Sequence, residues 1–271
     1  MKNLMTIFMA EFKKSHFLYF HTNMIYFSLL VWPIILFFSA YYSFKPFDTK
    51  SENVLSEYVS NQEIGSFLLI GYLGYIFYFS LMQSAFQMAP ERARGTLELI
   101  FLSPVSRLAV IYGRAMANLL EGVWLFFVFT VLGLFFFGDI QPHNWWGIPL
   151  SLFLLIISAV VWGGFLNAIF LFSRDAGFFF LIIQEPLLLF SGVRIPIPVL
   201  PIWGKFISYL FPLSYVLLIY REIVMRGASL FEVSTMIYSL LVVIIVFILL
   251  TSWIIRKAEK NSKINGSMAL Y

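Results

Sequence analysis

The sequence predicts an all-α polytopic membrane protein with six transmembrane helices. Two observations lead to this prediction. Hydrophobic residues make up 61% of the 271 residues and charged residues only 12%, whereas soluble domains average about 25% charged residues. The apolar residues are also gathered in long runs, and a helix needs roughly 20 of them to cross about 30 Å of hydrocarbon. A chain with this composition lies in lipid.

Six apolar runs are candidate membrane spans. They lie near 22–44, 64–88, 109–137, 148–172, 178–192 and 232–255. The fifth run is short, and the semi-apolar stretch after it is interrupted by Pro196, Pro198, Pro201, Gly204 and Pro212. A broken helix at membrane depth needs protein or a water-filled cavity around it to satisfy the freed backbone groups. We therefore expect residues 193–220 to form an outer re-entrant or interfacial element rather than a seventh span.

The Lys and Arg residues predict the orientation of the chain. With the N-terminus inside, the inner segments hold 12 of these residues and the outer segments hold 6. This excess favours a multi-pass protein of the cell membrane with both termini cytoplasmic, including a tail over 256–271. Apolar residues and lysines alternate over 1–21, which predicts an amphipathic helix in the inner membrane interface. A frayed cytoplasmic start is the alternative.

A short charged segment separates the second run from the third. It follows Pro90, which suits the first turn of a helix, and it stops at Pro104. Arg94 and Glu98 are four residues apart and share one helix face. The opposite face holds Ala93, Leu97, Ile100 and Phe101. The pattern predicts an amphipathic helix over 91–102, parallel to the inner surface; an ordinary positive-inside loop is the alternative.

Two stretches resemble ABC type-2 exporter permeases of the drug- and antibiotic-export type. ERARGTLELIFLSPVSR resembles the family's cytoplasmic segment, and the matching residues are Glu91, Gly95, Thr96, Leu97, Glu98, Pro104 and Ser106. Residues 189–227 resemble its outer segment through Ser191, Gly192, Pro196, Leu200, Pro201, Pro212, Leu213, Tyr215 and Arg221. The pair Arg194-Ile195 departs from the aromatic or apolar residues usual in the family, so we expect the outer mouth to differ.

This resemblance implies a permease half that pairs with a second half, the same or a homologous chain, and with two cytoplasmic ABC ATPase subunits. The helix over 91–102 would be the coupling helix. Its ATPase contacts would be Glu91, Arg92, Arg94, Gly95, Thr96, Leu97, Glu98 and Phe101. The outer re-entrant element would contain Gly192, Pro196, Pro201, Pro212 and Arg221. No G-x-x-x-x-G-K-[ST] loop occurs in the sequence, so ATP and Mg are expected in the partner subunit and no cofactor in this chain.

Three charges inside the predicted spans are candidates for the translocation path. Glu185 follows Arg174 by 11 residues, about 16 Å along a helix, which places it near the membrane midplane. A protonated or hydrogen-bonded structural acid is the alternative. Glu121 follows Arg114 by seven residues on the same helix face, which favours a structural pair or an inter-helix lock. For Arg221, anchoring and lining of the outer mouth are equally compatible with the sequence.

Other classes of function are disfavoured. The sequence has no cysteine and only His16, His21 and His143, and it lacks an H-E-x-x-H motif, so neither a metal site nor a membrane enzyme is predicted. The basic residues flank apolar runs, which indicates membrane orientation rather than binding of nucleic acid. A passive channel is a further alternative, although it would need no docking helix. We expect export of a hydrophobic or amphiphilic drug, antibiotic, peptide or lipid-like substrate; polysaccharide or lipid-linked glycan export is the runner-up.

Overall fold

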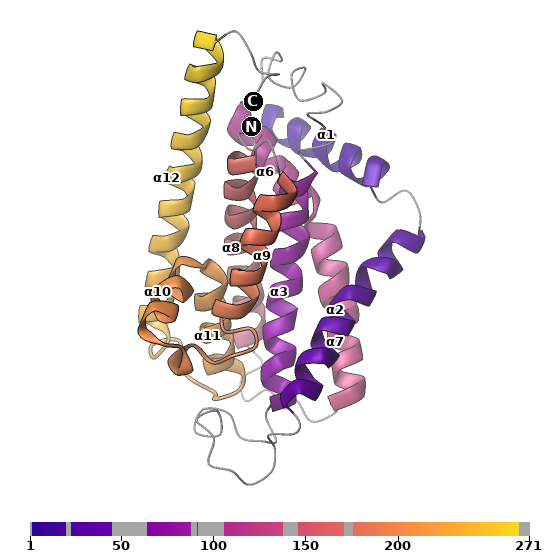
Figure 1. The fold of residues 1–271 in the computed structure, drawn as a ribbon, viewed down its shortest axis with the longest axis vertical. Helices are drawn as coiled ribbons and strands as arrows, with labels where there is room; N and C mark the ends of the chain where they lie inside the picture. Colours follow the sequence, from indigo (N-terminus) through magenta and orange to yellow (C-terminus); the bar gives the residue numbers. More distant parts are fainter. Residues whose placement is uncertain are drawn as a thin grey trace.

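The chain folds into a bundle of helices (Figure 1). The computed structural model describes residues 2–19, 23–44, 64–87, 91, 106–137, 146–170 and 176–265. The helices are α1 (Lys2–Tyr19), α2 (Asn23–Phe44), α3 (Ile64–Phe86), α6 (Arg107–Ala117), α7 (Leu119–Phe137), α8 (Gly147–Phe170), α9 (Ala176–Phe190), the 3₁₀ helix η3 (Ile197–Val199), α10 (Ile202–Leu210), α11 (Pro212–Val224) and α12 (Ser234–Asn265). These described residues contain no strand, which confirms the all-α prediction.

Within the described residues, four helical stretches are long and apolar enough to cross a membrane. They are Ile64–Phe86, Arg107–Phe136, Gly147–Phe170 and Ser234–Lys257. The pair α10 and α11 passes the same test only together, and a bend of 96° separates the two helices. The apolar parts of α2 and α9, Leu29–Phe44 and Phe178–Phe190, are shorter. A membrane-spanning helical protein is thus confirmed, whereas the count of six spans stays a prediction.

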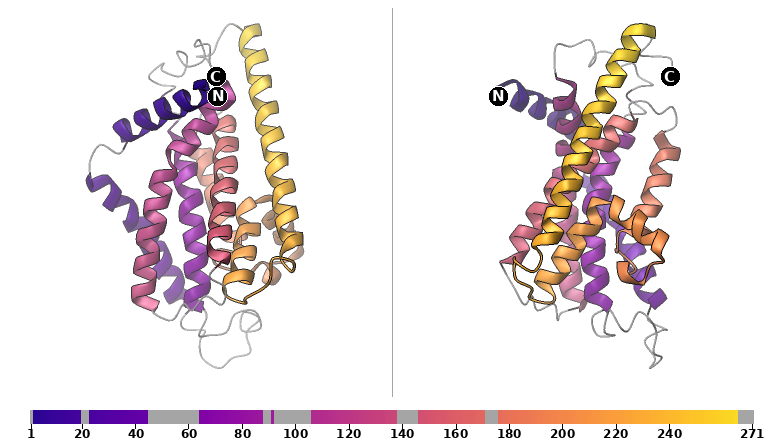
Figure 2. Two further views of the ribbon diagram at one scale, coloured as in Figure 1. Left: turned by 180° about the vertical axis from the view of Figure 1, so that it is seen from behind. Right: turned by 90° about the vertical axis from the view of Figure 1, so that its left-hand side faces the viewer.

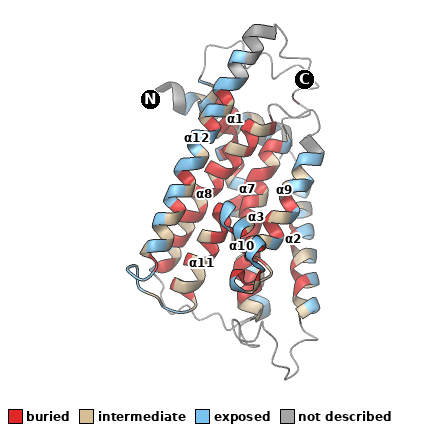
Figure 3. Ribbon diagram, turned by 60° about the vertical axis from the view of Figure 1, so that its left-hand side comes forward, coloured by how far each residue is buried: buried red, intermediate tan, exposed pale blue. Residues whose placement is uncertain are grey.

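Helix α3 is the centre of the bundle. Its sequence, IGSFLLIGYLGYIFYFSLMQSAF, is apolar on every side, and nearly every residue from Phe67 to Ala85 is buried. It packs against α2, α7, α8, α9 and α11, and Figure 3 shows it enclosed within the bundle. A helix that is apolar all round is stable only where other helices or lipid cover it. The surrounding helices therefore bury the apolar surface of α3.

The outer sides of the surrounding helices remain apolar and exposed. On α12 these side chains include Leu241, Val242, Ile245 and Leu249, and on α7 they include Phe127, Val131 and Phe135. Figure 3 shows the exposed side of α12 facing away from the bundle. Such an extended apolar surface would aggregate in water but is satisfied by lipid tails. The protein therefore has lipid as its solvent around the bundle.

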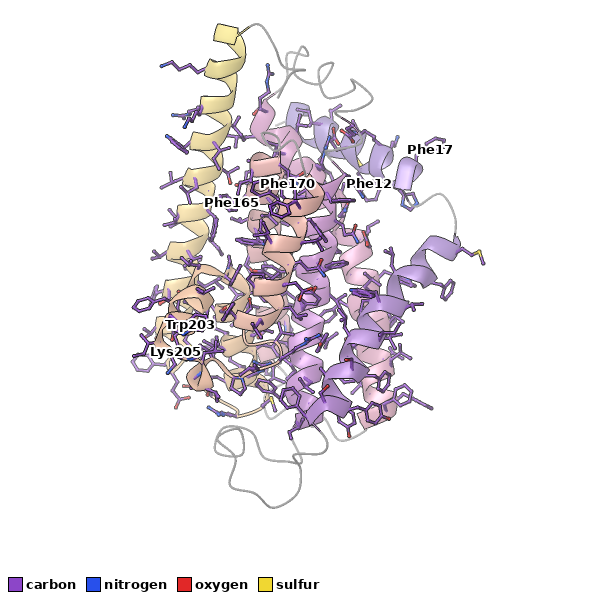
Figure 4. All side chains as sticks on the ribbon, viewed as in Figure 1. Phe12, Phe17, Phe165, Phe170, Trp203 and Lys205 are labelled. Atoms are coloured by element: carbon purple, nitrogen blue, oxygen red, sulfur yellow. The ribbon has the colours of Figure 1, made fainter. Side chains whose placement is uncertain are left out.

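Helix α1 lies across one end of the bundle, at an angle to the long helices (Figure 2). We call this the α1 end. The last turns of α12 project at the same end (Figure 1), and the helix continues through Asn265, so the predicted tail over 256–271 is helical for its first ten residues. Figure 4 shows Phe12 and Phe17 of α1 at this end and Trp203 and Lys205 of α10 near the other. Placement of α1 in the membrane interface stays a prediction.

The third predicted span is broken near its start. Helix α6 ends at Ala117 and α7 begins at Leu119, so Asn118 interrupts what the sequence presents as one apolar run. The Asn118 side chain donates a hydrogen bond to the Ser80 carbonyl of α3 at 3.2 Å. The interruption is slight, since Arg107–Phe136 together still qualify as one candidate span. The Asn118 side chain therefore ties the junction of α6 and α7 to α3.

The segment after α9 folds back onto α3. Helix α9 has 15 residues, about 22 Å of rise, which is too short for the full hydrocarbon thickness. The chain then turns at Gly192, whose φ of +80° lies in a region that favours glycine. Val193 packs so closely on α3 that a Cβ added at Gly71 would lie 2.3 Å from the Val193 carbonyl oxygen. This turn, the 3₁₀ helix η3, α10 and most of α11 correspond to the predicted element over 193–220.

Substitution of Gly71 tests this close contact. Gly71→Ala should lower the free energy of unfolding by about 1–3 kcal/mol, because its methyl group would meet backbone atoms that cannot rotate away. Gly113→Ala is the matched control, since its nearest neighbour would be 3.6 Å away. Thermal unfolding of the purified protein in detergent measures both. Equal stability of the two variants would contradict the packing of Val193 on α3.

Candidate functional site: an ion cluster where α1 meets α6

Four charged side chains from three segments meet at the α1 end. Arg114 of α6 donates to Glu91, with 2.6 Å between Nη2 and Oε2, and its Nε lies 3.7 Å from Oε2 of Glu11. Lys14 of α1 bridges the two acids, with its Nζ 2.9 Å from Oε1 of Glu91 and 3.3 Å from Oε2 of Glu11. We call these four residues the α1–α6 ion cluster. Its two cations and two carboxylates balance in charge.

The ion cluster is buried. The exposed fraction is 1% for Arg114, 4% for Glu91 and 7% for Glu11, while Lys14 is partly exposed. Charges removed from water cost several kcal/mol each, and their mutual attraction offsets this cost only where the partners are well placed. Removal of one member leaves another buried and uncompensated. The cluster is therefore sensitive to the position of each of its three segments.

Local sequence brings α1 and α6 close enough for these bonds. Glu11 and Lys14 are three residues apart, so they lie on the same face of α1. The two helices pack directly on each other, and a Cβ added at Gly113 would make ordinary van der Waals contact with the Phe8 Cα at 3.6 Å. Arg114 lies in the last turn of α6, where a cation also interacts favourably with the helix dipole. The side chain of Arg114 thus reaches both Glu11 and Glu91.

Among the predicted coupling residues, only Glu91 lies within the described part of the chain. Its predicted contact with an ATPase stays a prediction. In the structure its carboxylate is buried against Arg114 and Lys14. The other predicted contacts, Arg92, Arg94, Gly95, Thr96, Leu97, Glu98 and Phe101, and with them the predicted helix over 91–102, lie outside the described residues.

The expected pair between Arg114 and Glu121 does not form. Arg114 bonds to Glu91 and Glu11 instead, because α1 packs against α6 and brings Glu11 within reach of the guanidinium. Glu121 is buried, with 4% of its surface exposed. Within the described residues, no ion pair or hydrogen bond of its carboxylate is found. It remains an intramembrane acid, but not the partner of Arg114.

Glu185 lies on an exposed side of α9. Leu181 and Leu189, four residues before and after it, are exposed as well, so this face is apolar apart from the carboxylate. Its neighbour Gln184 is buried. Glu185 is therefore not enclosed by the described part of the chain, and its place in a translocation path stays a prediction.

The predicted outer element is anchored on α3 by Arg221. Its Nη1 donates to the Gly192 carbonyl at 2.7 Å and its Nη2 to the Phe67 carbonyl at 3.0 Å. The guanidinium carbon also lies 3.6 Å from the centre of the Phe67 ring, which adds a cation–π attraction. The sequence allowed Arg221 either to anchor this element or to line the outer mouth. These bonds favour the anchoring role.

The glycine and prolines predicted in this element each mark a change of direction. Gly192 takes the left-handed conformation, Pro196 precedes η3, and Pro201 precedes α10. Pro212 is the first residue of α11, where its missing N–H leaves no hydrogen bond unmade. The positions of these residues in the sequence therefore indicate where the chain turns.

Sequence reasoning missed several polar residues that join the helices. Glu11 drew no attention because its ion-pair partners are distant in sequence. Asn167 of α8 donates to the Ser84 hydroxyl at 2.8 Å and to the Gly163 carbonyl at 2.8 Å. An asparagine within an apolar run is a signal for such contacts. No group of three or more metal-binding His, Asp or Glu residues comes together in the described part of the chain.

The fold and its ion cluster define an integral membrane protein built around one buried helix. Residues 40–253 match the model of a family described as "ABC-2 family transporter protein". Since the match spans most of the sequence, the chain belongs to this family. It is the membrane-spanning permease component of an ABC transporter, a class that associates with ABC ATPase partners. A search among curated proteins gave no match.

Substitution of Arg114 tests the energetic weight of the ion cluster. Arg114→Gln should lower the free energy of unfolding by about 3–5 kcal/mol, because two carboxylates would remain buried beside a single lysine. Arg226→Gln is the matched control: it removes an arginine whose ion pair with Glu222 is exposed, and it should cost about 0–1 kcal/mol. Chemical or thermal unfolding in detergent compares the two. Similar losses would mean that the cluster is not a stabilising unit.

Proposed function

We propose that this chain is one half of an ATP-driven exporter that moves a hydrophobic or amphiphilic molecule out of the cell. The complete transporter would contain two permease halves and two cytoplasmic ABC ATPase subunits, which bind the ATP and Mg. Each half would cross the cell membrane six times, with both termini in the cytoplasm. The drug- and antibiotic-export motifs support this substrate class.

The observation that carries the proposal is the position of Glu91 in the ion cluster. Glu91 is the first residue of the predicted coupling helix over 91–102, and it follows the last residue of α3 by only five residues. Its carboxylate is bonded to α6 through Arg114 and to α1 through Lys14. A displacement of the coupling segment by an ATPase would therefore act directly on α1, α3 and α6. Because packed interiors switch between discrete arrangements, such a displacement can alter the packing of the whole bundle.

A differential affinity is required for this mechanism. ATP binding in the partner can change the permease only if the ATPase binds its two arrangements with different strength. The coupling segment is the contact through which this difference would act. The substrate would then gain a route between the two permease halves toward the outside.

The first test is the effect of the permease on ATP hydrolysis. Candidate ABC ATPase subunits are reconstituted one at a time in lipid with wild-type chain or with Glu98→Lys. We expect a stable complex in which the permease changes the hydrolysis rate, and loss of this effect with the charge reversal. Glu232→Lys is the control, because Glu232 is an exposed residue next to α12 at the other end of the bundle. If no ABC ATPase binds the wild-type chain, the proposal is wrong.

A second test separates docking from transmission. Glu91→Gln removes the charge that bonds to Arg114 and Lys14 but leaves the other seven predicted ATPase contacts unchanged. We expect the ATPase to remain bound while the permease changes its hydrolysis rate much less than wild type does. Pull-down measures binding, and phosphate release measures coupling. Unchanged coupling in this variant would show that the cluster does not transmit movement.

A further inference from the structure

Arg194, within the predicted outer element, has no carboxylate partner among the described residues. Arg194 follows the Gly192 turn, and its Nε donates to the Tyr72 hydroxyl of α3 at 2.7 Å. That hydroxyl in turn donates to the Leu36 carbonyl of α2 at 3.0 Å. The guanidinium is therefore held between the turn, α3 and α2.

The depth of Arg194 makes its charge costly. Tyr72 is eight residues from the first residue of α3, about 12 Å along the helix. The contact of Gly71 with the Val193 carbonyl holds the turn at this same level. A cation within hydrocarbon is expensive and is by default a functional residue whose partner must be identified.

The described part of the chain supplies no counter-ion for Arg194. None of its ion pairs involves Arg194 or Arg221, and Arg221 is satisfied by carbonyl oxygens instead. Glu185 is near enough for its charge to act on Tyr72 and Tyr75, but its carboxylate is not within 4.0 Å of the Arg194 guanidinium. Among the described residues around this turn, the two cations Arg194 and Arg221 therefore have only Glu185 as a nearby carboxylate.

The free end of the guanidinium has the geometry of an anion site. Because Nε is bonded to Tyr72, the donors left are those of Nη1 and Nη2, which make no hydrogen bond within the described residues; the Arg194 side chain as a whole is half-buried. These two nitrogens form a planar fork that matches the two oxygens of a carboxylate or phosphate. The bond to Tyr72 fixes its orientation before any ligand arrives.

We propose that Arg194 binds a phosphate or carboxylate group on an amphiphile, with its Nη1 and Nη2 as the donors. This inference rests on the proposed export of an amphiphilic substrate and adds that the substrate carries a negative head group. The same chemistry occurs in the head group of an anionic lipid, so the test must distinguish the two sources.

Binding of octyl phosphate to the full chain in phosphatidylcholine nanodiscs tests the proposal. We expect saturable binding, measured by tryptophan fluorescence or calorimetry. Arg194→Gln should weaken this binding by about tenfold or more. Arg194→Lys keeps the charge but loses the planar fork of donors, so its affinity for octyl phosphate should lie between those of wild type and Arg194→Gln. Arg226→Gln removes a positive charge beyond α11, away from the turn, and should bind as wild type does. Neutral octyl glucoside should not discriminate among the variants.

Tyr72→Phe tests the same site without removal of the arginine. Loss of the hydroxyl frees the guanidinium, so octyl phosphate should bind several-fold more weakly while thermal stability falls little. If Arg194→Gln does not fold, this variant still tests whether Arg194 binds octyl phosphate. Equal affinity for octyl phosphate in wild type, Arg194→Lys and Tyr72→Phe would overturn the proposal.

A second arm identifies the source of the anion. Nanodiscs that contain phosphatidylglycerol should weaken octyl phosphate binding if the site holds a lipid head group, and should leave it unchanged if it serves a free amphiphile. The assay needs no ATPase. Absence of octyl phosphate binding would therefore reject the anion site and leave the coupling proposal standing, and failure of coupling would not affect this result.

Discussion

The burial of α3 within lipid-facing helices is the constraint on which the rest of the structure depends. In hydrocarbon, apolar side chains gain little by leaving the solvent, so close packing and polar bonds must hold the helices together. Both kinds of contact meet on α3. Gly71 and Gly74 let the outer turn and α11 approach closely, and carbonyl or hydroxyl groups of α3 accept bonds from α6, α8 and α11.

The polar bonds are concentrated toward the two ends of α3. At one end Arg221 and Arg194 fasten the outer turn to Phe67 and Tyr72. At the other, Glu91 follows the helix and enters the ion cluster with α1 and α6. A buried helix bonded at both ends is suited to carry a movement from one side of a membrane to the other, since it cannot yield without altering its partners. This arrangement links the segment assigned to the ATPase with the segment assigned to the outer mouth.

The two ends differ in how charge is balanced. The ion cluster at the α1 end contains equal numbers of cations and carboxylates, so it is complete within the chain. At the other end, the partners of Arg194 and Arg221 are a tyrosine hydroxyl and carbonyl groups. Low dielectric strengthens both the attraction of a paired charge and the cost of an unpaired one. The first arrangement is therefore suited to holding segments together, and the second to receiving a ligand.

The sequence by itself determined the class of fold, the long apolar helices and the position of the turns after α9. These follow from local rules: hydrocarbon demands apolar runs, and glycine and proline set the backbone at turns. The family motifs pointed to a permease, and the family match agrees. Tertiary structure alone decided the partners of the charges. The spacing of Arg114 and Glu121 places them on one helix face, but the packing of α1 against α6 gives Arg114 the partners Glu91 and Glu11. Which acid an arginine meets depends on how distant segments pack, and no spacing along the chain records that.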